Sequence, residues 1–179
     1  MEFRELIEKR RSIRSFAENV TVTEEDVRKI IYAAQQAPSW KNSETGRYYI
    51  AVSQEMIEKL RNECLAEYNR NNTKNAAAII VTAYVSNRSG FECDGSATNE
   101  RGNEWGAYDL GLQNMNLILA ARDLGFDTLI MGLRDSAKLH ELFGIPEEQH
   151  VMSVIAVGKR AAEPEKPVRK NFEDIVKMF

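Results

Sequence analysis

The longest helical pattern of the chain, at residues 105–124, has apolar side chains on nearly every face. A helix with that distribution has to be covered all round, either at the centre of the fold or against a second subunit. Gly125 follows directly and suits a C-terminal cap. The rest of the chain is therefore expected to pack around this helix, with a second subunit as the alternative cover.

Strands and further helices are expected on both sides of this helix. Residues 76–85 form a continuous apolar run bounded by polar residues, which is typical of a strand buried on both faces. Thr23, followed by three acidic residues, indicates the start of a helix. The other predicted strands are residues 48–52, 127–133 and 150–158, and the other predicted helices are residues 3–13, 24–37, 56–68 and 136–142. This order predicts a two- or three-layer α+β fold.

The length of 179 residues is that of one domain, so we expect a single domain over residues 1–179. Residues 86–103 are polar and glycine-containing, and a loop of that length in a compact domain is usually functional or disordered. The tail at residues 159–179 has two prolines and then a closing apolar pattern. We expect it to dock onto its own subunit or a neighbour.

Composition excludes several classes of protein. The net charge of −3 and the pI of about 5.6 argue against a nucleic-acid-binding domain. No apolar run approaches the roughly 18 residues of a membrane span, and the first residues lack a signal peptide's apolar region. Two cysteines and two histidines are too few for a metal cluster, so no metal ligands are predicted. A reduced, cytoplasmic protein is expected.

Three arginines and a serine gather in the segment Arg10-Arg11-Ser12-Ile13-Arg14. A guanidinium group can donate two parallel hydrogen bonds to the oxygens of one phosphate, and a serine hydroxyl adds a further hydrogen-bond donor. The segment is therefore a candidate anion site. The alternative is a solvated basic face at a helix end, where cations complement the helix dipole.

Known catalytic signatures are absent from the sequence: it has no nucleophile elbow, no Walker loop and no Gly-x-Gly-x-x-Gly after a strand. Few side chains remain for acid–base or covalent catalysis. If the protein is an enzyme, a cofactor is expected to supply the chemistry. A protein without catalysis fits the same observation.

Several motifs together resemble the FMN-dependent nitroreductase superfamily, of which the chain is similar to the compact members. They are the arginine cluster, Ala37-Pro38-Ser39-x-x-Asn42, the helix from Asp109 to Gly125, and the closing Arg169-Lys170-x-Phe172-x-x-Ile175-Val176. The resemblance implies a homodimeric α+β fold with a central mixed sheet flanked by helices. It also implies FMN at the subunit interface and a tail, residues 159–179, that wraps the partner subunit.

The resemblance assigns cofactor roles to individual residues. It places Arg10, Arg11 and Ser12 at the flavin phosphate and ribityl chain, with Arg14 near the pyrimidine edge of the ring. A fixed cation there stabilises the negative charge of reduced flavin. The remaining FMN-binding residues are Pro38, Ser39 and Asn42 from the second subunit, the strand-end segment Met131, Gly132 and Leu133, and Arg169 at the phosphate, with Lys159 and Arg160 as weaker phosphate candidates.

The implied activity is that of an oxidoreductase passing hydride from NAD(P)H through flavin N5 to a nitroaromatic, quinone or similar acceptor, with no side-chain acid or base. Alternatives are dehalogenation, flavin fragmentation or FMN binding without catalysis. Many members continue after Asn42 with Gln-Pro-Trp, which this chain lacks. Phe91 in the 86–103 loop and Trp105 are expected to cover the open flavin face, although Trp105 fits the helix core equally well.

Overall fold

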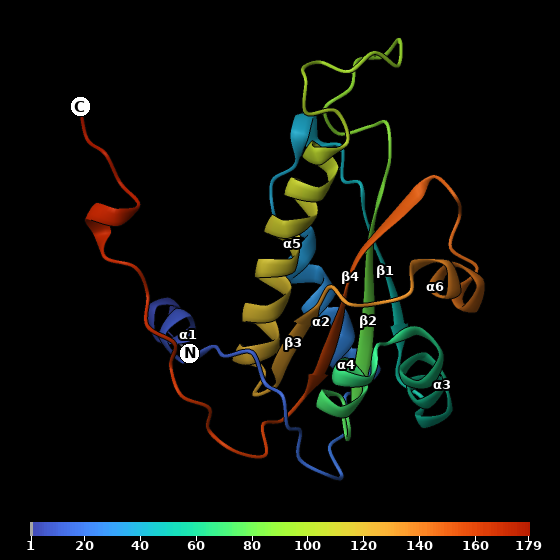
Figure 1. The fold of residues 1–179 in the computed structure, drawn as a ribbon, viewed down its shortest axis with the longest axis vertical. Helices are drawn as coiled ribbons and strands as arrows, with labels where there is room; N and C mark the ends of the chain where they lie inside the picture. Colours follow the sequence, from blue (N-terminus) through green and yellow to red (C-terminus); the bar gives the residue numbers. More distant parts are fainter. Residues whose placement is uncertain (1) are drawn as a thin grey trace.

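A four-stranded sheet with the order β1-β2-β4-β3 separates two layers of helices in the computed structural model, which describes residues 2–179 (Figure 1). Each neighbouring pair of strands is antiparallel. The α+β class is confirmed, but the sheet is not mixed as the resemblance implied. Within residues 2–179, parallel pairing is limited to one isolated bridge between Ser12 and Thr128, and the chain bends at residues 14 and 15 soon after it. The strands are β1 Gly46–Ala51, β2 Ala78–Val85, β3 Asp127–Met131 and β4 Gln149–Gly158.

Strand β2 is buried on both faces, as its continuous apolar sequence predicts. Ile79 and Val81 belong to one hydrophobic cluster, which includes residues of α3 and α6. Ala78 and Ile80 belong to a second cluster, which includes residues of α2 and α5. Successive strand residues point to opposite faces, so this one strand contributes to both clusters.

The helices follow the predicted order with one division. They are α1 Phe3–Lys9, α2 Glu24–Gln35, α3 Gln54–Cys64, α4 Glu67–Asn72, α5 Glu104–Asp123 and α6 Ser136–Phe143. The helix predicted over residues 56–68 is interrupted at Leu65, whose backbone is extended (φ −108°, ψ 140°). Leu65 forms a bridge with Arg134, and the carbonyl of Cys64 accepts the amide of Asp135. These long-range pairings end α3 there.

Helix α2 starts at the predicted cap. The Thr23 hydroxyl accepts the Asp26 amide at 3.1 Å, and the Asp26 carboxylate accepts the Thr23 amide at 2.9 Å. This reciprocal pair satisfies two otherwise free donors, and loss of such a cap costs about 1 kcal/mol. The cap fixes the start of the helix that leads to residues 38–42.

Helix α5 is covered on one side only. Leu110 and Leu117 are buried, and the helix packs against α2 and the sheet. Tyr108 and Met115, on another side, are exposed. In the single chain, one side of this helix is therefore an uncovered apolar surface, and the second subunit considered as its alternative cover would have to pack there.

The tail stands apart from the body beside α1 (Figure 1). It is mostly extended apart from a 3-10 turn at Phe172–Asp174, and its apolar residues Val168, Ile175 and Met178 are exposed. Residues 86–103 form no helix or named strand, in line with the loop predicted there. Among residues 2–179, no helix combines the length and apolar character that crossing a membrane requires.

Candidate functional site

The arginine cluster is held by the edge of the sheet. Helix α1 ends at Lys9, and Arg10 is its extended C-cap. The Ile13 amide donates to the Thr128 carbonyl at 3.0 Å, and the Ile13 and Phe16 side chains are buried. These two apolar residues fix the backbone beside β3, while Ser12 and Arg14 stay exposed.

Positive charge accumulates at Arg10 without a counter-ion. Burial, followed by the nearby charges of Arg169 and Arg11, lowers the pKa of the Arg10 guanidinium. Across residues 2–179, Arg10 has no ion pair. Arg11 donates to the carbonyls of Glu8 and Arg10, but its Nε is buried without an acceptor. Three guanidinium groups with an unused donor have the chemistry that an anion requires, so this cluster is a candidate anion site.

The start of the tail brings Arg169 into this cluster. The Ala17 amide donates to the Lys159 carbonyl at 2.8 Å, and the Ala161 amide donates to Ser15 at 3.0 Å. Further along, Lys166 pairs with Glu8 of α1. The sequence motif at Arg169 is thus placed near Arg10 by contacts that no local pattern specifies.

Arg160, a weaker phosphate candidate, is already paired with two carboxylates. Its guanidinium binds the buried Asp127 carboxylate, with Nη2 at 2.5 Å from Oδ1, and also pairs with Glu163. Arg122 of α5 reaches the same Asp127 at 3.2 Å. Arg160 therefore ties the tail to the sheet, and a free anion would have to compete with two carboxylates for it. Lys159, the other weaker candidate, is exposed.

The strand-end segment at Met131, Gly132 and Leu133 turns its main chain outward. The Met131 side chain is buried in the core, whereas Gly132 and Leu133 are exposed. A Cβ placed on Gly132 would meet no protein atom within 4 Å. The fold itself therefore does not require glycine there, and its missing side chain leaves the backbone open to a ligand.

Asn69 is a residue that the sequence analysis missed. It is 5% exposed, and its Nδ2 donates to the Leu133 carbonyl at 2.9 Å. Its only sequence signal is a polar residue in an asparagine-rich helix end, which indicates no partner. A cavity of about 910 Å³ opens beside this segment, lined by residues 62–67, 70, 132–136 and 138.

The predicted loop residues Pro38, Ser39 and Asn42 lie near the N-terminal end of α5. The Trp40 amide donates to the buried Asp109 carboxylate at 2.9 Å. The Ser39 hydroxyl accepts the Glu44 amide at 3.1 Å. Lys41, Asn42 and Glu44 have positive φ angles of 48°, 52° and 48°. Such left-handed backbone in non-glycine residues is costly and is concentrated at functional sites.

The structure does not bring the two predicted groups together within one chain. The arginine cluster lies near the C-terminal end of α5, where Arg160 joins Lys9 to Asp127 and Arg122. The 38–42 loop lies at the other end of this 20-residue helix. At 1.5 Å per residue the helix is about 30 Å long. One small cofactor cannot bridge that distance.

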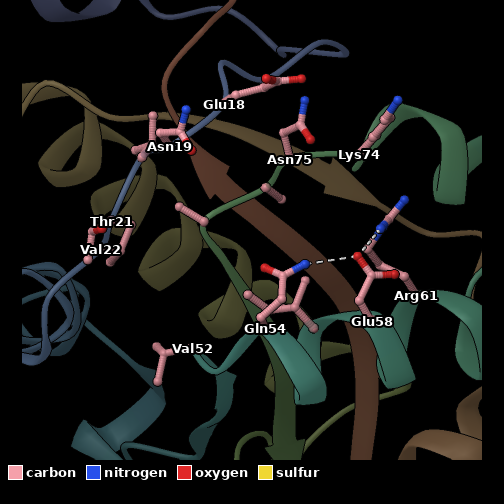
Figure 2. A pocket seen from close by; sticks show the side chains of 14 residues that line it. Glu18, Asn19, Thr21, Val22, Val52, Gln54, Glu58, Arg61, Lys74 and Asn75 are labelled. Carbon is pink, nitrogen blue, oxygen red and sulfur yellow. Dashed lines mark hydrogen bonds and ion pairs between the residues drawn. The ribbon is translucent and has the colours of Figure 1, made fainter.

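A second cavity, of about 710 Å³, lies between the start of α3 and residues 18–22 and 74–77. Figure 2 shows that Glu58 in its wall is held by Gln54 and Arg61. No residue predicted to bind FMN lines this cavity. Within the described part of the chain, no group of three or more acidic, histidine or cysteine residues could hold a metal ion.

Sequence comparison relates most of the chain to one family. A model of the nitroreductase family matches residues 7–159. A Bacillus subtilis protein described as an NAD(P)H nitroreductase is 30% identical over an alignment 190 positions long, gaps included, that covers 90% of each chain. An Archaeoglobus fulgidus protein described as an NADH dehydrogenase/NAD(P)H nitroreductase is 31% identical and covers 86% of this chain and 82% of its own.

Solved structures show the same fold. A protein of Exiguobacterium sibiricum, described as a nitroreductase and solved in complex with FMN, superposes with a TM-score of 0.86 at 23% identity, covering 100% of this chain and 98% of its own. A nitroreductase family protein of Streptococcus pneumoniae gives a TM-score of 0.84 at 22% identity, covering 99% and 100%.

Proposed function

The chain belongs to the nitroreductase family, and we propose that it is an FMN-dependent oxidoreductase that reduces nitroaromatic, quinone or similar acceptors with NAD(P)H. The observation that carries this proposal is the cluster of Arg10, Arg11 and Arg169, which gathers positive charge and an unused buried donor at one place. This arrangement fits a phosphate monoester, which carries nearly two negative charges at neutral pH.

The residues of one chain could contact FMN along its length, from the phosphate to the ring. Arg10, Arg11 and Arg169, with the exposed hydroxyl of Ser12, would hold the phosphate. The exposed main chain at Gly132 would lie against the ring, in a segment fixed by Asn69. When bound there, FMN would supply the redox chemistry, namely hydride transfer between NAD(P)H and an acceptor.

Arg14 is the residue that would tune this chemistry. It is exposed at a bend and makes no ion pair within residues 2–179. A free guanidinium at the pyrimidine edge would stabilise the negative charge that the ring gains on reduction. Protons for the acceptor would come from solvent, so the reaction consumes one NAD(P)H and one proton for each two-electron reduction.

A homodimer would complete the site. Pro38, Ser39 and Asn42 lie at the far end of α5 from the arginine cluster, so they could reach a bound FMN only from a second copy of the chain. Apolar side chains are exposed on α1, α5 and the tail, where a partner would cover them: Phe3, Ile7, Tyr108, Met115, Val168, Phe172, Ile175 and Met178. We propose that residues 159–179 wrap the partner subunit.

The absorbance spectrum of the purified protein tests the proposed function. We expect flavin bands that bleach on anaerobic addition of NADPH or NADH and return when a nitroaromatic or quinone is added. A protein that binds no flavin contradicts the proposal. A yellow protein that neither nicotinamide bleaches is an FMN-binding protein without this activity, and reoxidation by a halogenated acceptor alone indicates dehalogenation.

A further inference from the structure

A cavity of about 540 Å³ separates the 38–44 loop from the 86–103 loop. Its walls include Trp40 and Asn42 on one side and Arg88 and Phe91 on the other. Asn42 is one of the residues proposed to reach FMN from the second subunit. The cavity therefore borders the proposed flavin site.

Both walls of this cavity are fixed to the same buried carboxylate. Asp109 of α5 is 3% exposed and accepts the Trp40 amide from one loop and the Ser89 hydroxyl from the other. The Lys41 ammonium pairs with Glu92 at 2.8 Å across the two loops. The cavity thus has a defined shape although loops form it.

One positive charge in these walls remains uncompensated. Glu92 neutralises Lys41, whereas Arg88 forms no ion pair within residues 2–179. In addition, Trp40 Nε1 and Ser43 Oγ are buried without hydrogen-bond partners. The 86–103 wall therefore offers a free guanidinium, and the facing 38–44 wall offers unused polar groups.

The aromatic residues of the cavity suit a flat ligand. Trp40 packs against Trp105 in a tilted arrangement, with ring centroids 4.7 Å apart and an angle of 46° between the rings, and this contact holds the indole at the edge of the cavity. Phe91 lines the opposite wall. Two aromatic walls favour a planar, conjugated molecule, since such rings stack in offset or tilted arrangements.

We propose that this cavity is the acceptor subsite and takes a planar conjugated acceptor that carries a carboxylate, with Arg88 pairing the carboxylate. The inference rests on the proposed function, because the acceptor has meaning only beside a flavin. The inference specifies two further properties of that function: the acceptor carries a negative charge, and Arg88 selects for that charge.

The first test compares two acceptors that differ in charge, 4-nitrobenzoate and the neutral 4-nitrobenzamide. Replacement of Arg88 by glutamine removes one hydrogen-bonded charge pair, so we expect the KM for 4-nitrobenzoate to rise about tenfold. The KM for 4-nitrobenzamide and those for NADH and NADPH should stay within about twofold. Arg101→Gln is the matched control, since Arg101 lies in the same loop but pairs with Glu100 and Glu104.

The second test measures binding without turnover. Titration of the oxidised holoprotein with 4-nitrobenzoate should quench tryptophan fluorescence, because Trp40 lines the cavity. Arg88→Gln should weaken this binding about tenfold, and Arg101→Gln should leave it unchanged.

The outcomes separate the two proposals. Equal effects of Arg88→Gln on both nitro compounds, or no binding of 4-nitrobenzoate to the unchanged protein, overturn the acceptor subsite. A rise in the KM for NADH or NADPH alone also overturns it and assigns Arg88 to the phosphates of the reductant. Arg88-dependent binding in a holoprotein that reduces no acceptor supports an anion-binding cavity and overturns the proposed function instead.

Discussion

Replacement of Arg10 by glutamine should weaken FMN binding while leaving the FMN-free protein intact. In the folded chain Arg10 is half-buried beside Arg169 and Arg11, and both burial and these charges lower its pKa. Arginine stays protonated in proteins, so the unfavourable environment reduces the stability of the FMN-free fold instead of discharging the residue. Removing the charge should therefore leave that stability equal or slightly higher.

The bound state should respond in the opposite direction. A hydrogen bond to a charged group contributes about 1.5–3 kcal/mol, which corresponds to a loss of FMN affinity of about 10- to 150-fold. At a fixed excess of FMN, ligand stabilisation falls by the same free energy. For a chain of this length that lowers the melting temperature by roughly 3–12 °C.

Fluorescence titration with FMN and thermal unfolding with and without FMN measure both quantities. Arg4→Gln is the control, because Arg4 is an exposed arginine of α1 outside the cluster. The reasoning is refuted if Arg10→Gln leaves the FMN dissociation constant unchanged. It is refuted equally if the FMN-free variant melts several degrees lower, which would make Arg10 a structural residue.

Two further predictions concern the ring and the subunit contact. Arg14→Gln should lower the midpoint potential of bound flavin and slow turnover, as measured by equilibration with reference dyes; an unchanged potential would remove Arg14 from the pyrimidine edge. Phe172→Asp, which puts a charge on the exposed apolar tail, should shift the protein from dimer to monomer in sedimentation, with Glu173→Gln as a neighbouring control. A monomeric unsubstituted protein, or a Phe172→Asp dimer as tight as the original, would contradict a role of the tail in dimerisation.

The sequence predicted the local elements well where short-range physics decides them. The Thr23 cap starts α2 as expected, because a hydroxyl and a carboxylate three residues apart satisfy adjacent backbone donors. The apolar run of β2 is buried on both faces, because the residues on each face are apolar and each face packs against its own layer of helices. The break at Leu65 was missed, since it depends on pairing with Arg134, which is far away in sequence.

For the candidate site, the cations of residues 10–14 could be recognised from the sequence, because residues adjacent in the chain stay close in space. The motif resemblance also implied Arg169 at the phosphate, and the fold supplies the contacts that bring it near Arg10, whereas the pairing of Arg160 with the buried Asp127 follows from the fold alone. The tertiary structure also decided that residues 38–42 lie at the opposite end of α5. These outcomes depend on how the sheet and helices pack. Packing brings together side chains that are far apart in the sequence, and no local sequence pattern indicates which of them will meet.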